Sequence, residues 1–136
     1  MSKQAIESNK APGAIGTYSQ GIRAGGTIWL SGQLPLDPAT GQLLTGDMRD
    51  QVRQVFRNLA AVAEAGGSSL DQAVKVTVFL VDLGHFAIVN EVMAEFFTRP
   101  YPARAAIGVA SLPRGAAVEA DAVDRGDRSI IIVVAT

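Results

Sequence analysis

The chain has 136 residues, 48% hydrophobic and 18% charged, which is long enough to bury one core and predicts a single domain over residues 1–136. Twelve basic and thirteen acidic residues leave a net charge of −1, so no overall charge attracts nucleic acid or an anionic membrane. The lack of cysteine excludes disulfides and thiolate chemistry, and a single histidine excludes a histidine-rich metal site. No secretory signal or membrane-spanning apolar run is visible, so we expect a soluble cytoplasmic protein.

The first third of the chain predicts a β-hairpin followed by a long loop. Gly13 disfavours a helix in residues 1–16, which we interpret as an entry segment. Consecutive glycines at positions 25 and 26 are typical of a tight turn, and they predict a hairpin with strands over 18–24 and 27–31. Residues 32–46 form a loop of a length that is usually functional or covers an interface.

An amphipathic helix is predicted from a cap at Asp47 to about residue 65, where two glycines end it. Its apolar residues recur at steps of three and four and form one stripe: Met48, Val52, Val55, Phe56, Leu59, Val62 and Ala63. Its polar side carries three arginines spaced four apart, Arg49, Arg53 and Arg57. Such a row can bind phosphates, but the acidic residues beside it favour a solvated face.

The second half of the chain alternates strands with one more helix. In chain order we expect a strand over 73–81, a helix from about 82 to 97, strands over 103–109 and 116–123, a charged turn over 124–128, and a last apolar strand or arm over 129–134. The order β-β-α-β-α-β-β predicts an α+β fold in which both helices cover one face of the sheet. An apolar C-terminal extension is expected at about 126–136.

Side-chain alternation along the strands predicts which residues face away from the helices. It places Arg104, Glu119 and Ser31 on one open face, together with Trp29 and Phe79. The residues predicted to face the helices include Val74, Val76, Val78 and Leu80, then Ala105, Ile107 and Val109. The open face is too apolar for a simple solvated surface, so we interpret it as a subunit interface.

Arg104 and Glu119 are the candidate functional residues. Arg104 follows Pro102 at the mouth of a strand of small residues, where a guanidinium has room to bind a planar anion through two parallel hydrogen bonds. Glu119 interrupts a run of small apolar residues, where packing does not require a carboxylate. The alternative is a structural ion pair at an interface, without chemistry.

Six segments carry a resemblance to a known family. They are AIGTYSQG at 14–21, LSGQ at 30–33, VFLVDL at 78–83, FAIVN at 86–90, PAR at 102–104 and LPRGAAVE at 112–119. Together, in this order, they resemble the reactive-intermediate deaminase family, also called the YjgF or L-PSP family. The similarity runs from about residue 10 to 124.

The resemblance implies a chorismate-mutase-like fold with a mixed sheet, assembled as a homotrimer with three clefts between subunits. It also implies hydrolysis of reactive enamines and imines, such as 2-aminoacrylate, to 2-keto acids and ammonia, with no metal or other cofactor. By the same resemblance Arg104 binds the substrate carboxylate and Glu119 handles water and proton. The residues that match positions lining the cleft or near its wall are Tyr18, Ser31, Gly32, Phe86 and Asn90.

Three departures leave the subgroup and the physiological substrate open. Thr17 stands where the family usually has proline, Ala106 where many members have cysteine or serine, and Gly108 where an acidic residue is common. Two other function classes are alternatives. A trimer that binds small carboxylates without catalysis, or acts like a chaperone, is one. A ribonuclease or translation inhibitor is the other, and the near-neutral charge and lack of clustered bases disfavour it.

Overall fold

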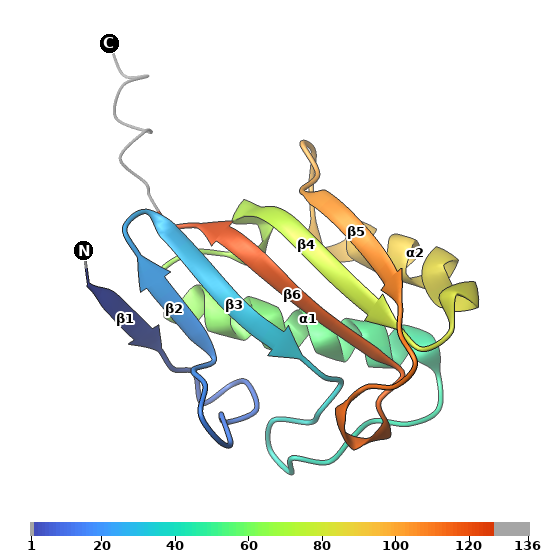
Figure 1. Cartoon of the computed structure of the whole chain (residues 1–136). Helices are drawn as coiled ribbons and strands as arrows, with labels where there is room; N and C mark the ends of the chain where they lie inside the picture. Colours follow the sequence, from blue (N-terminus) through green and yellow to red (C-terminus); the bar gives the residue numbers. More distant parts are fainter. Residues whose placement is uncertain (1, 127–136) are drawn as a thin grey trace.

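The computed structural model describes residues 2–126, which form one six-stranded sheet with two helices packed on one face (Figure 1). Its elements are β1 (Lys3–Ile6), β2 (Gly21–Ala24), β3 (Thr27–Gln33), α1 (Met48–Ala65), β4 (Ala73–Leu80), α2 (Phe86–Phe96), β5 (Ala103–Gly108) and β6 (Val118–Arg125). The sheet order is β1-β2-β3-β6-β4-β5, and only β4 and β5 pair in parallel. The predicted α+β fold with a mixed sheet is therefore confirmed. The predicted apolar strand at 129–134 and most of the C-terminal extension lie outside the described residues.

β1 is a strand that the sequence pattern did not predict. It pairs antiparallel with β2, with Lys3 opposite Ala24 and Ile6 opposite Gly21. Ile6 is buried, whereas Lys3, Gln4 and Ala5 are exposed. A four-residue edge strand with three exposed residues carries no period-two pattern, so its pairing depends on the edge that β2 offers.

The core lies between the sheet and α1, as the apolar stripe predicts. Phe56 and Leu59 are almost fully buried, and they pack with residues of β3, β4 and β6 such as Ile28 and Val78. Burying a side chain of this size is worth about 1.5–3 kcal/mol. The Phe56 ring also lies 5.6 Å from the Phe96 ring, which joins α1 to α2.

The ends of α1 follow the predicted caps. The Asp47 side chain accepts a hydrogen bond of 2.7 Å from the backbone N–H of Arg49, which satisfies one free donor of the first turn. At the other end the Gly66 N–H donates to the carbonyls of Val62 and Ala63, and Gly67 adopts a φ of +82°. That left-handed conformation favours glycine and turns the chain toward β4.

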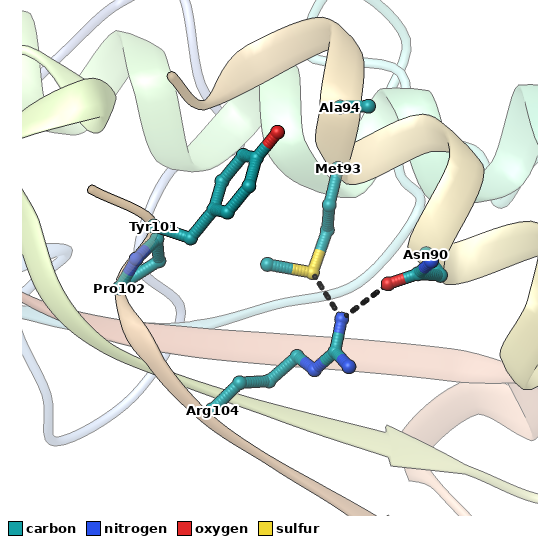
Figure 2. A pocket seen from close by; sticks show the side chains of 6 residues that line it. All are labelled: Asn90, Met93, Ala94, Tyr101, Pro102 and Arg104. Carbon is teal, nitrogen blue, oxygen red and sulfur yellow. Dashed lines mark hydrogen bonds between the residues drawn. The ribbon is translucent and has the colours of Figure 1, made fainter. Parts of the chain in front are cut away.

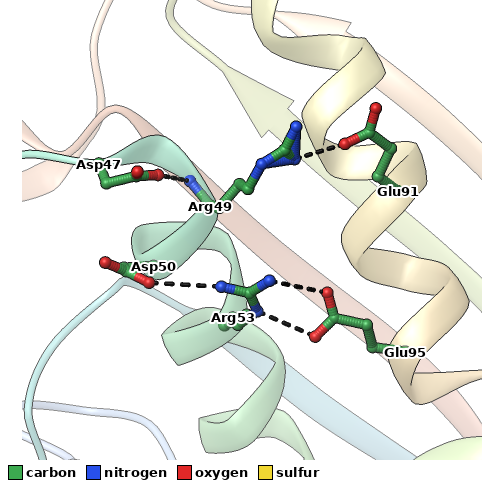
Figure 3. Close-up of polar contacts among 6 residues, drawn as sticks. All are labelled: Asp47, Arg49, Asp50, Arg53, Glu91 and Glu95. Atoms are coloured by element: carbon green, nitrogen blue, oxygen red, sulfur yellow. Dashed lines mark hydrogen bonds and ion pairs between the residues drawn. The ribbon is translucent and has the colours of Figure 1, made fainter.

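The polar side of α1 faces carboxylates of α2 (Figure 3). Arg53 donates two hydrogen bonds of 2.9 Å to Glu95, and Arg49 pairs with Glu91. Hydrogen bonding to Arg53 lowers the pKa of the Glu95 carboxyl. Two of the three arginines of this row are therefore engaged with acidic side chains of the same chain, which agrees with the interpretation that the row is not a phosphate-binding surface.

The register of β5 contradicts one prediction. Arg104 lies opposite Val76, which is fully buried beneath the helices, and Ile107 lies opposite Phe79 on the open face. Arg104 therefore points to the helix side of the sheet, and Ile107 is 43% exposed on the other side. Placing Arg104 on the face of Glu119 was wrong because β5 is an edge strand of small residues. Its single large apolar residue, Ile107, lies on the open face, so it does not mark the helix side of the strand.

Two further positions differ from the prediction. Val74 is 47% exposed because an irregularity between Ala73 and Lys75 shifts the register against β6. Asp124 was expected in a charged turn, but it is 1% exposed near the end of β6, opposite Ile28. Neither α1 nor α2 has the combination of length and hydropathy that a membrane-spanning helix requires.

Candidate functional site

The predicted site residues fall into two separate groups in the chain. The first group, here called the arginine pocket, lies between α2 and β5 and is lined by Asn90, Met93, Ala94, Tyr101, Pro102 and Arg104. The second group, here called the glutamate cleft, lies at the end of β3 and the start of β6. Its lining includes Tyr18, Ser31, Gly32, Gln33, Leu34, Arg114 and Glu119.

In the arginine pocket, residues of α2 lie along one side of the Arg104 side chain (Figure 2). Its Nη1 donates a hydrogen bond of 2.9 Å to Asn90 Oδ1 and lies 3.6 Å from Met93 Sδ. Its Cζ lies 4.7 Å from the centre of the Phe86 ring, within the range of a cation–π interaction. The structure thus brings together three of the predicted residues, Arg104, Asn90 and Phe86, and adds Met93 to them.

Helix geometry explains this grouping. Phe86, Asn90 and Met93 are spaced by four and three residues, so they share one side of α2. The remaining buried face of α2, which includes Val89 and Val92, packs on the core. Within residues 2–126, Arg104 forms no ion pair with a carboxylate, although it is an exposed cation.

In the glutamate cleft, a β-bulge places Ser31 and Gly32 beside Glu119. Three steps along β3, from Leu30 to Gln33, match only two steps along β6. A Cβ atom at Gly32 would overlap the Glu119 carboxylate, so a larger residue at this position requires the Glu119 side chain to move. The predicted grouping of Ser31, Gly32 and Glu119 is present in the structure.

The other wall of this cleft is the segment before β2. Tyr18 is 53% exposed and lines the cleft. Ser31 joins this segment to β3, because its Oγ donates 2.5 Å to the Ser19 carbonyl and its N–H donates 3.0 Å to the Gln20 carbonyl. The Ser31 hydroxyl is therefore used to hold the Tyr18 segment in place.

Gln20 and Arg114 are two residues of this region that the sequence interpretation did not single out. The Gln20 amide is buried; it donates 2.7 Å to the Pro12 carbonyl and accepts 2.6 Å from the Ser8 N–H, which fixes the N-terminal segment against the cleft. Arg114 has a φ of 61° and donates 2.9 Å to the Gly41 carbonyl, which ties two loops together. A non-glycine residue in the left-handed region is a recognisable sign of a site, but only coordinates reveal it.

The carboxylate of Glu119 lies in an environment that favours its protonated form. Partial burial raises the pKa of the Glu119 carboxyl, and the nearby Asp121 carboxylate raises it further. Burial also raises the pKa of Asp121, opposed by Lys75 and by a hydrogen bond from Thr77. Asp121 lies two residues along β6 from Glu119 on the same face, where the alternation of side chains along this strand predicts both acids.

Arg104 and Glu119 do not meet within one chain. Arg104 extends from the helix side of β5, whereas Glu119 lies opposite Phe79 on the open face. Each chain therefore presents one cationic half and one acidic half on different faces. Among residues 2–126, no group of three or more histidine, cysteine or acidic side chains is arranged to hold a metal ion.

Two of the departures from the family pattern lie on β5, the strand that carries Arg104. Ala106 lies opposite Val78, on the same side of β5 as Arg104. A Cβ atom at Gly108 would come within 3.1 Å of the Leu83 side chain, so a larger residue there requires Leu83 to move.

Comparisons with known proteins agree on one family. The family model described as Endoribonuclease L-PSP matches residues 8–124. The RutC family protein y4sK of Sinorhizobium fredii is 51% identical over 118 residues, covering 87% of this chain and 94% of that protein. The 2-iminobutanoate/2-iminopropanoate deaminase of Dermatophagoides farinae is 42% identical over 121 residues, covering 89% and 94%.

A solved structure confirms the fold. The crystal structure of RidA from the Antarctic bacterium Psychrobacter sp. PAMC 21119 superposes with a TM-score of 0.86 at 48% sequence identity. The match covers 90% of this chain and 98% of that one. The predicted chorismate-mutase-like α+β architecture thus agrees with a solved relative along nearly its whole length.

Proposed function

The chain belongs to the L-PSP family of reactive-intermediate deaminases, and on that premise we propose that it hydrolyses imines and enamines of small 2-amino acids. The substrates are of the 2-aminoacrylate type, and the products are a 2-keto acid and ammonia. Relatives named 2-iminobutanoate/2-iminopropanoate deaminase support this assignment. The observation that carries it is Arg104, a pocket-lining guanidinium with neutral neighbours and no carboxylate partner within residues 2–126.

In the proposed mechanism Arg104 binds the substrate carboxylate. A guanidinium and a carboxylate are planar and form two parallel charge-assisted hydrogen bonds, which fix both the position and the orientation of the ligand. This contact places the imine carbon at a defined distance from the rest of the cleft, which lowers the entropic cost of the reaction. Arg104 thus supplies binding and orientation.

Glu119 manages the proton. The imine nitrogen carries a proton, so its carbon is electrophilic, and a water molecule adds to that carbon while the Glu119 carboxylate accepts a proton from the water. The resulting carbinolamine collapses when Glu119 returns the proton to nitrogen and the C–N bond breaks, so that ammonia leaves. The hydroxyl proton passes to the Glu119 carboxylate as the oxygen becomes the keto oxygen, and that proton then goes to the released ammonia, which gives ammonium. The raised pKa of Glu119 suits both steps, because a carboxyl that titrates closer to neutral pH exchanges protons more readily in each direction.

The proposed site forms between subunits of a homotrimer. The arginine pocket of one subunit faces the glutamate cleft of its neighbour, which accounts for the two halves lying on different faces of one chain. The open face of the sheet exposes Trp29 at 52% and Ile107 at 43%, an apolar surface that association would bury. Light scattering during size-exclusion chromatography tests this; a monomer at micromolar concentration would leave each cleft without its second wall.

A non-catalytic carboxylate-binding trimer is the competing function, since Arg104 alone suffices for binding. Ribonuclease activity receives less support, because Arg49 and Arg53 on α1 are paired with acidic residues of α2. The deciding experiment generates imines in situ from several amino acids with an amino-acid oxidase and follows ammonia release and semicarbazide trapping. Faster ammonia release and less trapped imine support the enzyme, whereas pyruvate binding without either effect supports the binding protein.

A further inference from the structure

The two edges of the Arg104 guanidinium have different surroundings. Nη1 is occupied, because it donates to Asn90 Oδ1 at 2.9 Å and contacts Met93 Sδ at 3.6 Å. Nε and Nη2 form the opposite edge, and within residues 2–126 they make no hydrogen bond (Figure 2). This free edge carries two parallel N–H donors, the arrangement that a carboxylate accepts bidentately.

The plane of the guanidinium is also held. The Phe86 ring lies 4.7 Å from Cζ, and Phe86, Asn90 and Met93 come from successive turns of one helix. An arginine side chain loses rotamer entropy when it is fixed in one orientation. Part of that cost is already met in the free protein, which leaves the ligand less ordering to impose.

Asn90 is uncharged, which affects how Arg104 can bind an anion. Its amide oxygen accepts from Nη1 as a carboxylate oxygen would, but it does not neutralise the guanidinium. An acid at this position would form an ion pair with Arg104 and compete with an incoming anion. Such an ion pair is present on the outer surface of the helices, where Glu95 binds Arg53.

We infer that Asn90 is a positioning residue that holds Nη1, so that the carboxylate of the ligand binds side-on to the Nε–Nη2 edge of Arg104. This inference rests on the proposed function only in taking a small carboxylate as the ligand. It assigns Asn90 a role through Arg104 in place of the wall position that the family resemblance implies. Met93 and Phe86 act in the same way, through the sulfur contact and the ring.

The test measures pyruvate affinity by calorimetry for the full chain and its variants. Asn90→Ala should weaken pyruvate binding about tenfold, the loss expected when a hydrogen bond to a charged group is removed. Asn90→Asp should weaken it more than Asn90→Ala, because the introduced carboxylate competes for the guanidinium. Met93→Leu keeps the apolar volume and should weaken pyruvate binding less than Asn90→Ala does. The matched control is Asn9→Ala, at an exposed asparagine remote from Arg104.

A double-mutant cycle separates positioning from direct contact. In the Arg104→Lys background, Asn90→Ala should have little further effect, because lysine has no Nη1 to hold. Equal losses in both backgrounds would mean that Asn90 contacts the ligand itself, and unchanged pyruvate affinity in Asn90→Asp would also overturn the inference. Melting temperatures of all variants exclude misfolding as the cause.

The same variants distinguish this inference from the proposed catalytic function. If imines are turned over, Asn90→Ala should raise KM while leaving kcat nearly unchanged. If the unchanged protein binds pyruvate but turns over no imine, the catalytic proposal fails and the positioning role stands. If the unchanged protein binds no pyruvate at all, the positioning role fails too.

Discussion

The outer surface of the helices and the pocket between α2 and β5 each hold an arginine against α2, but through different partners. On the outer surface Arg53 donates two hydrogen bonds of 2.9 Å to Glu95, with Asp50 3.4 Å away (Figure 3). In the pocket Arg104 contacts an amide oxygen and a thioether (Figure 2). The phenyl ring of Phe86 also lies 4.7 Å from its Cζ. The first arginine is neutralised within the chain, whereas the second has no carboxylate partner within residues 2–126, and the proposed function assigns its charge to a bound anion. The partners of an arginine therefore indicate its role better than its exposure does.

Exchanging each arginine for lysine is the strongest test of this comparison. Arg104→Lys keeps the charge but loses the two parallel N–H donors of the planar guanidinium. We therefore expect kcat/KM for imine hydrolysis to fall roughly thirty- to a thousandfold. Arg53→Lys makes the same chemical change at a structural pair and should leave kcat/KM unchanged. Steady-state ammonia release measures kcat/KM for both variants. Equal losses in the two variants would show that Arg104 has no role in the reaction that Arg53 lacks.

Glu119→Gln should separate binding from turnover. The amide keeps the size of the side chain but cannot exchange a proton, so kcat should fall by roughly a hundredfold or more. Pyruvate affinity should stay close to that of the unchanged protein, because the carboxylate contact belongs to Arg104. Full turnover in this variant would remove Glu119 from the proton-transfer role.

Asp124 can be compared with Glu119, because it is also an acid with a raised pKa but lies outside both the arginine pocket and the glutamate cleft. Its Oδ2 accepts a 3.4 Å hydrogen bond from the Ser68 hydroxyl, and burial raises its pKa to about 7. The folded state therefore holds this proton more tightly than the unfolded state, whose aspartate titrates near 3.8, and stability falls as pH rises between these two values.

Asp124→Asn should remove the loss of folding stability that accompanies ionisation of Asp124 as the pH rises. At pH 8 the variant should be more stable than the unchanged protein by about 1–3 kcal/mol, and the difference should shrink toward pH 4. Urea unfolding at both pH values measures it, with catalytic activity expected to be unaffected. A variant that is less stable at pH 8 would show that the ionised carboxylate has a partner that stabilises it.

Asp121→Asn gives the smallest expected effect and concerns Glu119 directly. Removing the neighbouring charge leaves burial as the main cause of the raised pKa of Glu119, so that pKa should fall. The limb of the pH–kcat profile on which activity rises with pH should therefore move to lower pH. An unmoved limb would show that another group controls it.

Much of the fold could be predicted from the sequence because its signals are local. The stripe and caps of α1 depend on spacing along one helix, and the hairpin of β2 and β3 depends on two glycines. β1 was missed because its pairing is specified by the neighbouring strand. Asp124 was assigned to a turn because charge is typical of turns, whereas its burial depends on how β3, β4 and Ser68 surround β6.

The residues of the candidate site could be proposed from the sequence, but their geometry could not. Arg104 and Glu119 stand out as charges among small residues, and the family resemblance adds Tyr18, Phe86 and Asn90. Which face each occupies depends on the register between β5 and β4 and on the bulge in β3, which are tertiary features. The hydrogen bond between Asn90 and Arg104, on which the proposed role of Asn90 rests, depends on the distance between α2 and β5, which no local pattern encodes.

The most direct test of the account mixes two variants that are each expected to have strongly reduced activity. Arg104→Lys and Glu119→Gln are unfolded together, refolded as an equal mixture, and assayed for imine hydrolysis beside each variant refolded alone. If each site takes Arg104 from one subunit and Glu119 from its neighbour, random assortment restores both residues in about a quarter of the clefts, and activity should recover to about that fraction of the unchanged protein. A mixture no more active than its two components would contradict a site shared between subunits.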